Sequence, residues 1–176
     1  MKYIVKLLLL TGIFFCSRCG SRSEVSAKKD YYPSGKLRSI VHYKGEKKFG
    51  ASVSYFENGK ISSSATFADD KFQGKLLFFY PTGKKMREQY YNKDGNPDGI
   101  YSSWYEEGNL RQQGKYTKGL MNEKWVTYYR NGTIEGIEFY KDNLKDSVWI
   151  YYAKDGNKTK EEKYRNDQLI SSRSFN

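Results

Sequence analysis

Apolar and aromatic residues recur along the chain in short runs that are separated by turn-forming residues. Each run is about eight residues long, is rich in Tyr, Phe, Ile, Val, Thr and Ser, and lacks the i, i+3, i+4 spacing of a helix. Such runs predict β-strands. In residues 37–44, alternation places Leu37, Val41 and Tyr43 on one face and polar residues on the other, which predicts one half-buried face.

A glycine that closes a turn-like tetrad recurs between these runs. The spacing is 24 residues, with one step of 25, through Gly35, Gly59, Gly83, Gly108, Gly132 and Gly156. Glycine at the last position of such a tetrad supplies a positive φ at little cost. A second loop separates successive strand pairs, and the single inserted residue falls in the third of these loops, residues 92–97. A fixed period of this length is typical of repeat proteins.

Two series of aromatic residues keep register with the glycines. The upstream ladder lies four residues before each glycine, at Tyr31, Tyr55, Phe79, Trp104, Tyr128 and Tyr152. The downstream ladder lies eight residues after each glycine, at Tyr43, Phe67, Tyr91, Tyr116, Tyr140 and Tyr164. We expect both ladders to hold neighbouring hairpins together, because an isolated hairpin is marginally stable. The second strand of each repeat carries apolar groups at both parities, so it either packs on both sides or exposes one aromatic face. In the second case Tyr101, Trp125 and Trp149 form a candidate binding surface.

The repeats predict an all-β fold, an elongated single-layer antiparallel meander of about six stacked β-hairpins. Residues 31–170 form the six hairpins, residues 20–30 are expected to be a linker, and residues 171–176 a C-terminal tail. Residues 1–19 have a different composition from the repeats. They combine a basic start with an apolar run of about ten residues, too short to span a bilayer, and this pattern predicts a signal peptide.

Both cysteines, Cys16 and Cys19, lie where this apolar run ends, and they are candidates for lipidation of a bacterial lipoprotein type. We therefore expect export to the cell envelope with a lipid anchor in the membrane. The alternative is ordinary cleavage after Ser21 or Ala27, which would give a soluble periplasmic or secreted protein. A redox role for the C-x-x-C pair is disfavoured, because no strand-to-helix context follows it.

The residue inventory argues against an enzyme. His42 is the single histidine and the cysteines are confined to the first nineteen residues, so the repeats cannot build a His/Cys metal site, and no cofactor is expected. The acidic pairs at residues 69–70, 106–107 and 161–162 are adjacent in sequence, and none recurs in an apolar setting that would separate their pKa values. P-loop, G-x-G-x-x-G and G-x-S-x-G motifs are missing from the sequence.

The chain is basic, with a formal net charge of +11. Removal of residues 1–19 takes away Lys2, Lys6 and Arg18 and leaves about +8, an excess that attracts anionic partners. The basic residues are spread through loops and turns, which favours a solvated rim. Nucleic acid is not expected as a partner of an exported chain. A protein or an envelope glycan fits better, since Trp and Tyr also pack on sugar rings; the oligomeric state is left open.

Several short motifs carry a family resemblance. They are N-G-K-I at 58–61, E-G-N-L at 107–110, G-K-Y-T-K-G at 114–119 and K-W-V-T-Y-Y-R-N-G at 124–132. The chain resembles the variant MORN repeat of bacterial proteins, which include YwqK-family antitoxins. The resemblance implies stacked hairpins without catalytic residues. A second glycine, present at Gly50, Gly74 and Gly99, is replaced by Glu123 and Ser147, and the final repeat has lost an aromatic at Ala153 and is expected to be an end cap.

These observations predict a non-enzymatic repeat scaffold of the cell envelope that presents an aromatic and basic β surface to a protein or glycan partner. The alternative is an antitoxin-like module that binds and neutralises a toxin protein.

Overall fold

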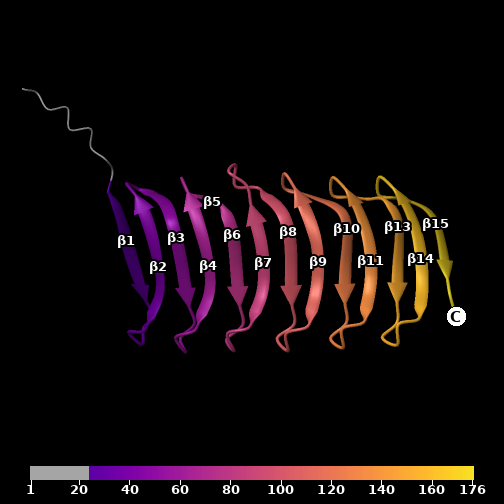
Figure 1. Cartoon of the computed structure of the whole chain (residues 1–176), viewed down its shortest axis with the longest axis horizontal. Coiled ribbons are helices and arrows are strands. Elements are labelled where there is room, and N and C mark those ends of the chain that lie inside the picture. Colours follow the sequence, from indigo (N-terminus) through magenta and orange to yellow (C-terminus); the bar gives the residue numbers. More distant parts are fainter. Residues whose placement is uncertain (1–23) are drawn as a thin grey trace, which may run out of the picture.

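The structure is a computed structural model, and it describes residues 24–176. They form a single antiparallel sheet of fifteen strands, drawn out along one axis (Figure 1), and this confirms the predicted all-β meander. The strands are β1 (Val25–Tyr31), β2 (Leu37–Lys44), β3 (Lys47–Tyr55), β4 (Ile61–Ala68), β5 (Lys71–Phe72), β6 (Gly74–Phe79), β7 (Lys85–Tyr91), β8 (Pro97–Trp104), β9 (Leu110–Thr117), β10 (Leu120–Tyr128), β11 (Ile134–Lys141), β12 (Leu144–Lys145), β13 (Ser147–Tyr152), β14 (Lys158–Arg165) and β15 (Gln168–Ser174).

Strand order follows chain order across the sheet. Two short strands lie off this path, because β5 pairs only with β4 and β12 only with β11. At about 4.8 Å per strand, the thirteen strands of the main path give a sheet roughly 60 Å long. Within residues 24–176, no helix is long and apolar enough to cross a membrane.

The turn glycines end each hairpin at the lower edge of the sheet in Figure 1, which we call the turn edge. The Gly35 N–H donates to the Tyr32 carbonyl (2.9 Å), and the Tyr32 N–H donates to the Lys36 carbonyl (2.8 Å). All six glycines have positive φ, between 81° and 109°, as this turn requires. A register shift beside each turn adds one residue to the returning strand, as between Asp30 and Tyr31 in β1.

Tight two-residue loops join the hairpins at the opposite, loop edge. Asp69 and Asp70 both have positive φ (49° and 67°), the conformation of a type I′ turn, and residues 142–143 and 166–167 repeat it. The loop at residues 92–97 differs, because the Gly95 N–H donates to the Asn92 carbonyl (3.0 Å) in the pattern of the turn edge. The inserted residue therefore makes this loop wider than the two-residue loops along the same edge.

Both ends of the described chain correct the predicted boundaries. β1 covers residues 25–30, where a linker was expected, and β15 covers residues 171–174, where a tail was expected. Each pairs along its length with its single neighbour, so backbone hydrogen bonds form these strands. Every residue of both strands is exposed, and a strand without a buried face leaves no alternating pattern in the sequence. The predicted signal peptide, with Cys16 and Cys19, lies outside the described residues.

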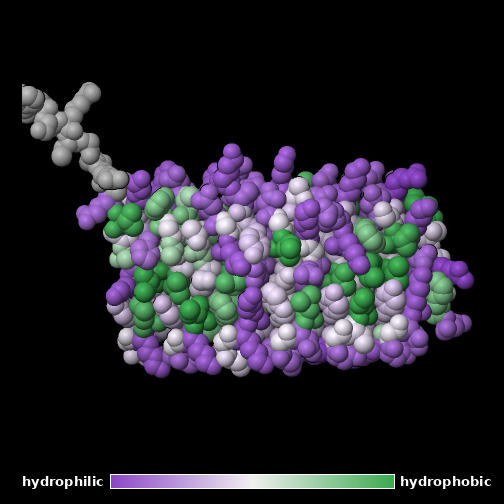
Figure 2. All heavy atoms as spheres, viewed as in Figure 1, coloured by the Kyte–Doolittle hydropathy of each residue, from purple (hydrophilic) through white to green (hydrophobic). Residues whose placement is uncertain are grey.

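No second layer covers either face of the sheet in residues 24–176, so side chains pack sideways along the faces. The apolar residues that this packing buries most are Leu76, Trp125 and Trp149. Figure 2 shows one face, on which apolar patches lie between hydrophilic rims at the two edges. The two faces differ in how their aromatic residues pack, and that difference locates the candidate binding surface.

Candidate binding surface

The face that carries the downstream ladder is the packed face. Strand alternation places Tyr101, Trp125 and Trp149 on it as well, each between two ladder residues. Trp125 lies 5.1 Å from Tyr116 and 6.3 Å from Tyr140 between ring centroids, and Trp149 lies 5.1 Å from Tyr140 and 5.3 Å from Tyr164. These distances suit attractive aromatic pairs. The rings from Tyr101 to Tyr164 therefore form one continuous row across three hairpins.

Gly114 makes room for the centre of this row. A Cβ atom at Gly114 would lie 2.0 Å from the indole of Trp125, so the ring rests directly on the backbone of β9. Trp125 is 2% exposed and Trp149 is 4% exposed. The prediction that these two tryptophans form a binding surface is therefore wrong, because sideways packing in a single-layer sheet buries them. Tyr101 is half-buried in the same row.

Two glutamates accept the hydroxyl groups of ladder tyrosines on the packed face. Glu138 accepts a hydrogen bond from Tyr140 (3.1 Å), and Glu162 accepts one from Tyr164 (2.9 Å). Burial raises the pKa of Glu138, against the opposing hydrogen bond from Tyr140. The Lys160 ammonium is the main cause that lowers the pKa of Glu162. Burial, followed by the neighbouring Glu138, raises the pKa of Tyr140.

The acidic pairs considered for catalysis have structural partners. The Asp70 carboxylate accepts a hydrogen bond from the Lys48 backbone N–H (2.8 Å), which joins two neighbouring loops. The Glu107 carboxylate forms an ion pair with Arg130 (2.8 Å), which joins two neighbouring turns. Neighbours Glu161 and Glu162 point to opposite faces by strand alternation. His42 Nδ1 lies 2.7 Å from the Ala51 carbonyl oxygen. Among residues 24–176, no three His, Cys, Asp or Glu side chains come together as a metal site would require.

The opposite face carries the upstream ladder, and we call it the hollow face. No ring of this ladder makes an aromatic pair within the described residues; instead three of its members line open hollows near the turn edge. Their volumes are about 380 Å³ beside Tyr55, 300 Å³ beside Trp104 and 360 Å³ beside Tyr128. Leu37 lines the first hollow together with Tyr55, so its predicted place on the face of Val41 and Tyr43 is wrong. The register shift beside the turn reverses it.

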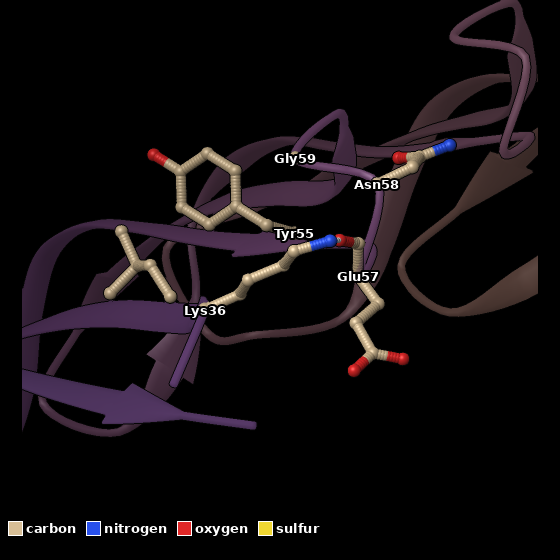
Figure 3. A pocket seen from close by; sticks show the side chains of 6 residues that line it. Lys36, Tyr55, Glu57, Asn58 and Gly59 are labelled. Atoms are coloured by element: carbon tan, nitrogen blue, oxygen red, sulfur yellow. Dashed lines mark hydrogen bonds between the residues drawn. The ribbon is translucent and has the colours of Figure 1, made fainter. Parts of the chain in front are cut away.

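The first hollow shows how neighbouring turns build these sites (Figure 3). The Lys36 side chain reaches from its own turn to the next, where its ammonium donates to the Glu57 carbonyl (2.8 Å) beneath the ring of Tyr55. Lys84 is the counterpart of Lys36 in the third repeat, and its ammonium likewise donates to the Glu107 carbonyl (3.0 Å) beside Trp104. Lys60 does the same between them, with the Thr82 carbonyl (2.6 Å). These lysines tie turns together rather than form a free rim.

A charged cluster lies on the hollow face between the hollows of Tyr55 and Tyr128. Lys75 (2.9 Å) and Lys85 (3.0 Å) contact the Glu88 carboxylate, and the Tyr90 hydroxyl donates to it (3.0 Å). Burial alone would raise the pKa of Glu88, but these three hydrogen bonds outweigh it and lower the pKa to about 2. The Lys85 ammonium also lies 5.3 Å from the ring centroid of Trp104. This face therefore combines aromatic rings with fixed cations.

Comparison with known proteins agrees with this architecture. Residues 27–44, 50–69, 72–93, 97–118 and 124–142 match the MORN repeat variant family, and these ranges cover more than half of the chain. The chain belongs to the MORN repeat variant family. MORN repeats are generally non-enzymatic, and this chain is accordingly a repeat scaffold or binding module. No curated protein sequence matches it.

The last hairpin lies beyond the matched MORN repeats but keeps their geometry. Gly156 has a φ of 90°, and Tyr164 packs on Trp149 as Tyr140 packs on Trp125. Ala153 stands where earlier MORN units place an aromatic residue at the start of the turn tetrad. Ser147 and Glu123, which replace a glycine, keep positive φ (59° and 61°).

Sequence reasoning missed a third series of tyrosines in the MORN units. Each lies in a turn and donates its hydroxyl to the carbonyl of the upstream-ladder residue one repeat later, at 2.7–2.8 Å. The series is Tyr32, Tyr80, Tyr105 and Tyr129. Its 24-residue recurrence was visible in the sequence, but a tyrosine in a turn gives no sign of a partner 23 or 24 residues away.

Proposed function

We propose that this MORN-repeat protein is a non-catalytic binding module of the cell envelope that holds an extended glycan or protein segment on its hollow face. The observation that carries the proposal is the row of hollows, each lined by one aromatic residue of the upstream ladder. One repeat contributes two strands, so the hollows of Trp104 and Tyr128, one repeat apart, are about 10 Å apart along the sheet, and those of Tyr55 and Trp104, two repeats apart, are about 19 Å apart. A row of hollows along the sheet favours a partner that is itself extended.

The chemistry of the hollows suits either kind of partner. A half-buried ring such as Tyr55 or Trp104 offers its open side as an apolar surface for a sugar ring or an aliphatic side chain. Lys85 beside Trp104 and Lys124 beside Tyr128 supply hydrogen-bond donors and positive charge at the same places. The hollows are wide and shallow, and they hold no converging acid and base that would support catalysis.

A binding assay with paired variants tests the hollow face. The full chain is mixed with insoluble cell-wall polysaccharide, and the bound fraction is measured for the wild type and for the W104A/Y128A double variant. We expect the double variant to bind at least tenfold more weakly, because stacking on aromatic rings supplies much of the affinity. The control is F49A, which removes an exposed aromatic outside the hollows and should leave binding unchanged.

A second arm of the experiment addresses a protein partner. A photo-crosslinking amino acid in place of Lys124, which lines the third hollow, should capture a partner in intact cells, whereas the same group in place of Phe49 should not. Capture of one small protein that arrests growth when produced alone would favour the antitoxin-like alternative. Equal crosslinking at both positions and equal polysaccharide binding by all variants would contradict a role for the hollow face.

The envelope location rests on the first nineteen residues. We propose that Cys16 or Cys19 is lipidated after export and anchors the repeats to a membrane. Metabolic labelling with a radioactive fatty acid should mark the wild-type chain and fail to mark the C16S/C19S double variant. Labelling that survives the double substitution would contradict the anchor, and an unlabelled wild-type chain outside the cytoplasm would favour ordinary secretion.

A further inference from the structure

The row of rings on the packed face is interrupted at the inserted residue. Ring contacts run from Phe67 through Phe72 to Tyr91 and begin again with Tyr101 and Tyr116, and no aromatic pair joins the two stretches in residues 24–176. A cavity of about 160 Å³ occupies the interruption. Its lining consists of Arg87, Gln89, Tyr91, Pro97, Tyr101 and Tyr116.

Arg87 brings an uncompensated positive charge to this cavity. Its guanidinium carbon lies 4.3 Å from the ring centroid of Phe78, which fixes the plane of the group. Its Nε atom is buried and has no hydrogen-bond partner, and none of the ion pairs of residues 24–176 includes Arg87. A buried donor normally has an acceptor, but the described part of the chain supplies none for the Arg87 Nε–H.

Later repeats show what is missing from the cavity. Gln89 lies opposite Leu76 in the sheet, as Glu138 lies opposite Trp125 and Glu162 opposite Trp149. In those two repeats the glutamate carboxylate accepts the hydroxyl of the next ladder tyrosine. In the third repeat a neutral amide takes that position, and it donates to the Tyr90 carbonyl (2.9 Å).

Tyr91, the counterpart of Tyr140 and Tyr164, has no hydroxyl hydrogen bond within the described residues, and neither has Tyr116. The third repeat therefore lacks the internal carboxylate of the fifth and sixth repeats, and its Arg87 lies where the sixth repeat places Lys160, which pairs with Glu162. Both differences favour an external carboxylate, which would accept from the guanidinium and from the free tyrosine hydroxyls together.

We propose that this cavity, the Arg87 pocket, binds the carboxylate side chain of a glutamate or aspartate from a partner protein. The incoming group takes the place that Glu138 and Glu162 fill in their own repeats. The volume of the pocket equals that of about five water molecules, at roughly 30 Å³ each, which suits one side chain and is below the size of most small-molecule sites. The basic repeats also favour an acidic partner. Because the pocket lies on the face opposite the hollows, it is a second site that goes beyond the function proposed above.

Nuclear magnetic resonance titration of the full chain with N-acetyl-L-glutamate methylamide tests the pocket. We expect saturable shifts of the Arg87 Nε–H signal in the millimolar range, because one charge-assisted contact gives modest affinity. The glutamine analogue should cause no saturable shift. R87Q should weaken binding at least tenfold, and R111Q, which changes an exposed arginine outside the pocket, should leave it unchanged.

A second variant tests the comparison between repeats without removing the arginine. Q89E should supply the carboxylate from within the chain, raise the melting temperature and block the glutamate probe. Glutamate binding that persists at wild-type strength in R87Q, or in a folded Q89E variant, would overturn the proposal. Tighter binding of methyl galacturonoside than of the glutamate probe would also overturn it, in favour of an acidic glycan.

Discussion

The packed face and the hollow face carry aromatic ladders of equal regularity, but the rings of only one ladder pack against other rings. On the packed face, ladder residues such as Tyr116 and Tyr140 have a large ring between them on the adjacent strand, Trp125. On the hollow face, the neighbours of the ladder are Leu37 beside Tyr55 and Lys85 beside Trp104, which leave space around each ring. Burial in a single-layer sheet therefore depends on the neighbouring strand, not on the period of the ladder.

The largest expected effect separates a core ring from a hollow ring. W125A should lower the free energy of unfolding by about 3–5 kcal/mol, because it removes a fully buried indole and leaves a cavity. Y128A removes a half-buried ring that lines an open hollow, and we expect it to cost about 1 kcal/mol. Urea unfolding measures both, and equal costs would break the distinction between the faces.

Two glycines test how closely Trp125 packs on the backbone of the packed face. Both Gly114 and Gly136 lie in strand interiors with ordinary φ, but a Cβ atom would lie 2.0 Å from Trp125 at the first and 3.8 Å from its nearest neighbours at the second. G114A should cost about 1–3 kcal/mol, because the indole must move. G136A should be neutral or stabilise slightly. If chemical unfolding gave the same value for both, Trp125 could not rest on Gly114.

The smallest expected effect is a difference in pH dependence between one acid on each face. The pKa of Glu88 on the hollow face is lowered to about 2, so its contribution to stability is present at neutral pH and is lost as the pH falls from the ordinary carboxyl range to about 2. Burial raises the pKa of Glu138 on the packed face, so stability falls as the pH rises through its raised value.

Melting temperatures recorded between pH 2 and pH 8 check these opposite slopes. E88Q should flatten the decline on the acidic side, and E138Q should flatten the decline above the ordinary carboxyl range. The same change of slope from both substitutions would contradict the opposite pKa shifts.

The sequence was sufficient for the repeat architecture, because its signals are local. A turn glycine such as Gly83 needs positive φ whatever surrounds it, and alternation within eight residues defines a strand. The faces could not be assigned in this way. Apolar or aromatic residues occur at both parities of this strand, at Trp125 on one face and at Val126 and Tyr128 on the other, and only contact with Gly114 on the neighbouring strand shows that Trp125 is the buried one.

Features of the site that join distant repeats were also beyond sequence reasoning. The bond from the Lys36 ammonium to the Glu57 carbonyl depends on how two turns stack, which their sequences do not express. The Arg87 pocket arises from three departures together, namely an inserted loop residue, Gln89 in a glutamate position and an arginine beside it. Each departure is unremarkable when read alone.

Tryptophans on the two faces have different environments, and the exchange rates of their indole N–H protons reveal that difference in the unmodified chain. The structure places Trp104 in an open hollow, Trp125 in the core without an acceptor for its N–H, and Trp149 in the core with its N–H donated to the Phe139 carbonyl (2.9 Å). We predict that Trp104 exchanges within minutes in deuterated buffer, whereas Trp125 and Trp149 stay protected until the sheet opens. Exchange of Trp125 as fast as that of Trp104 would contradict the account.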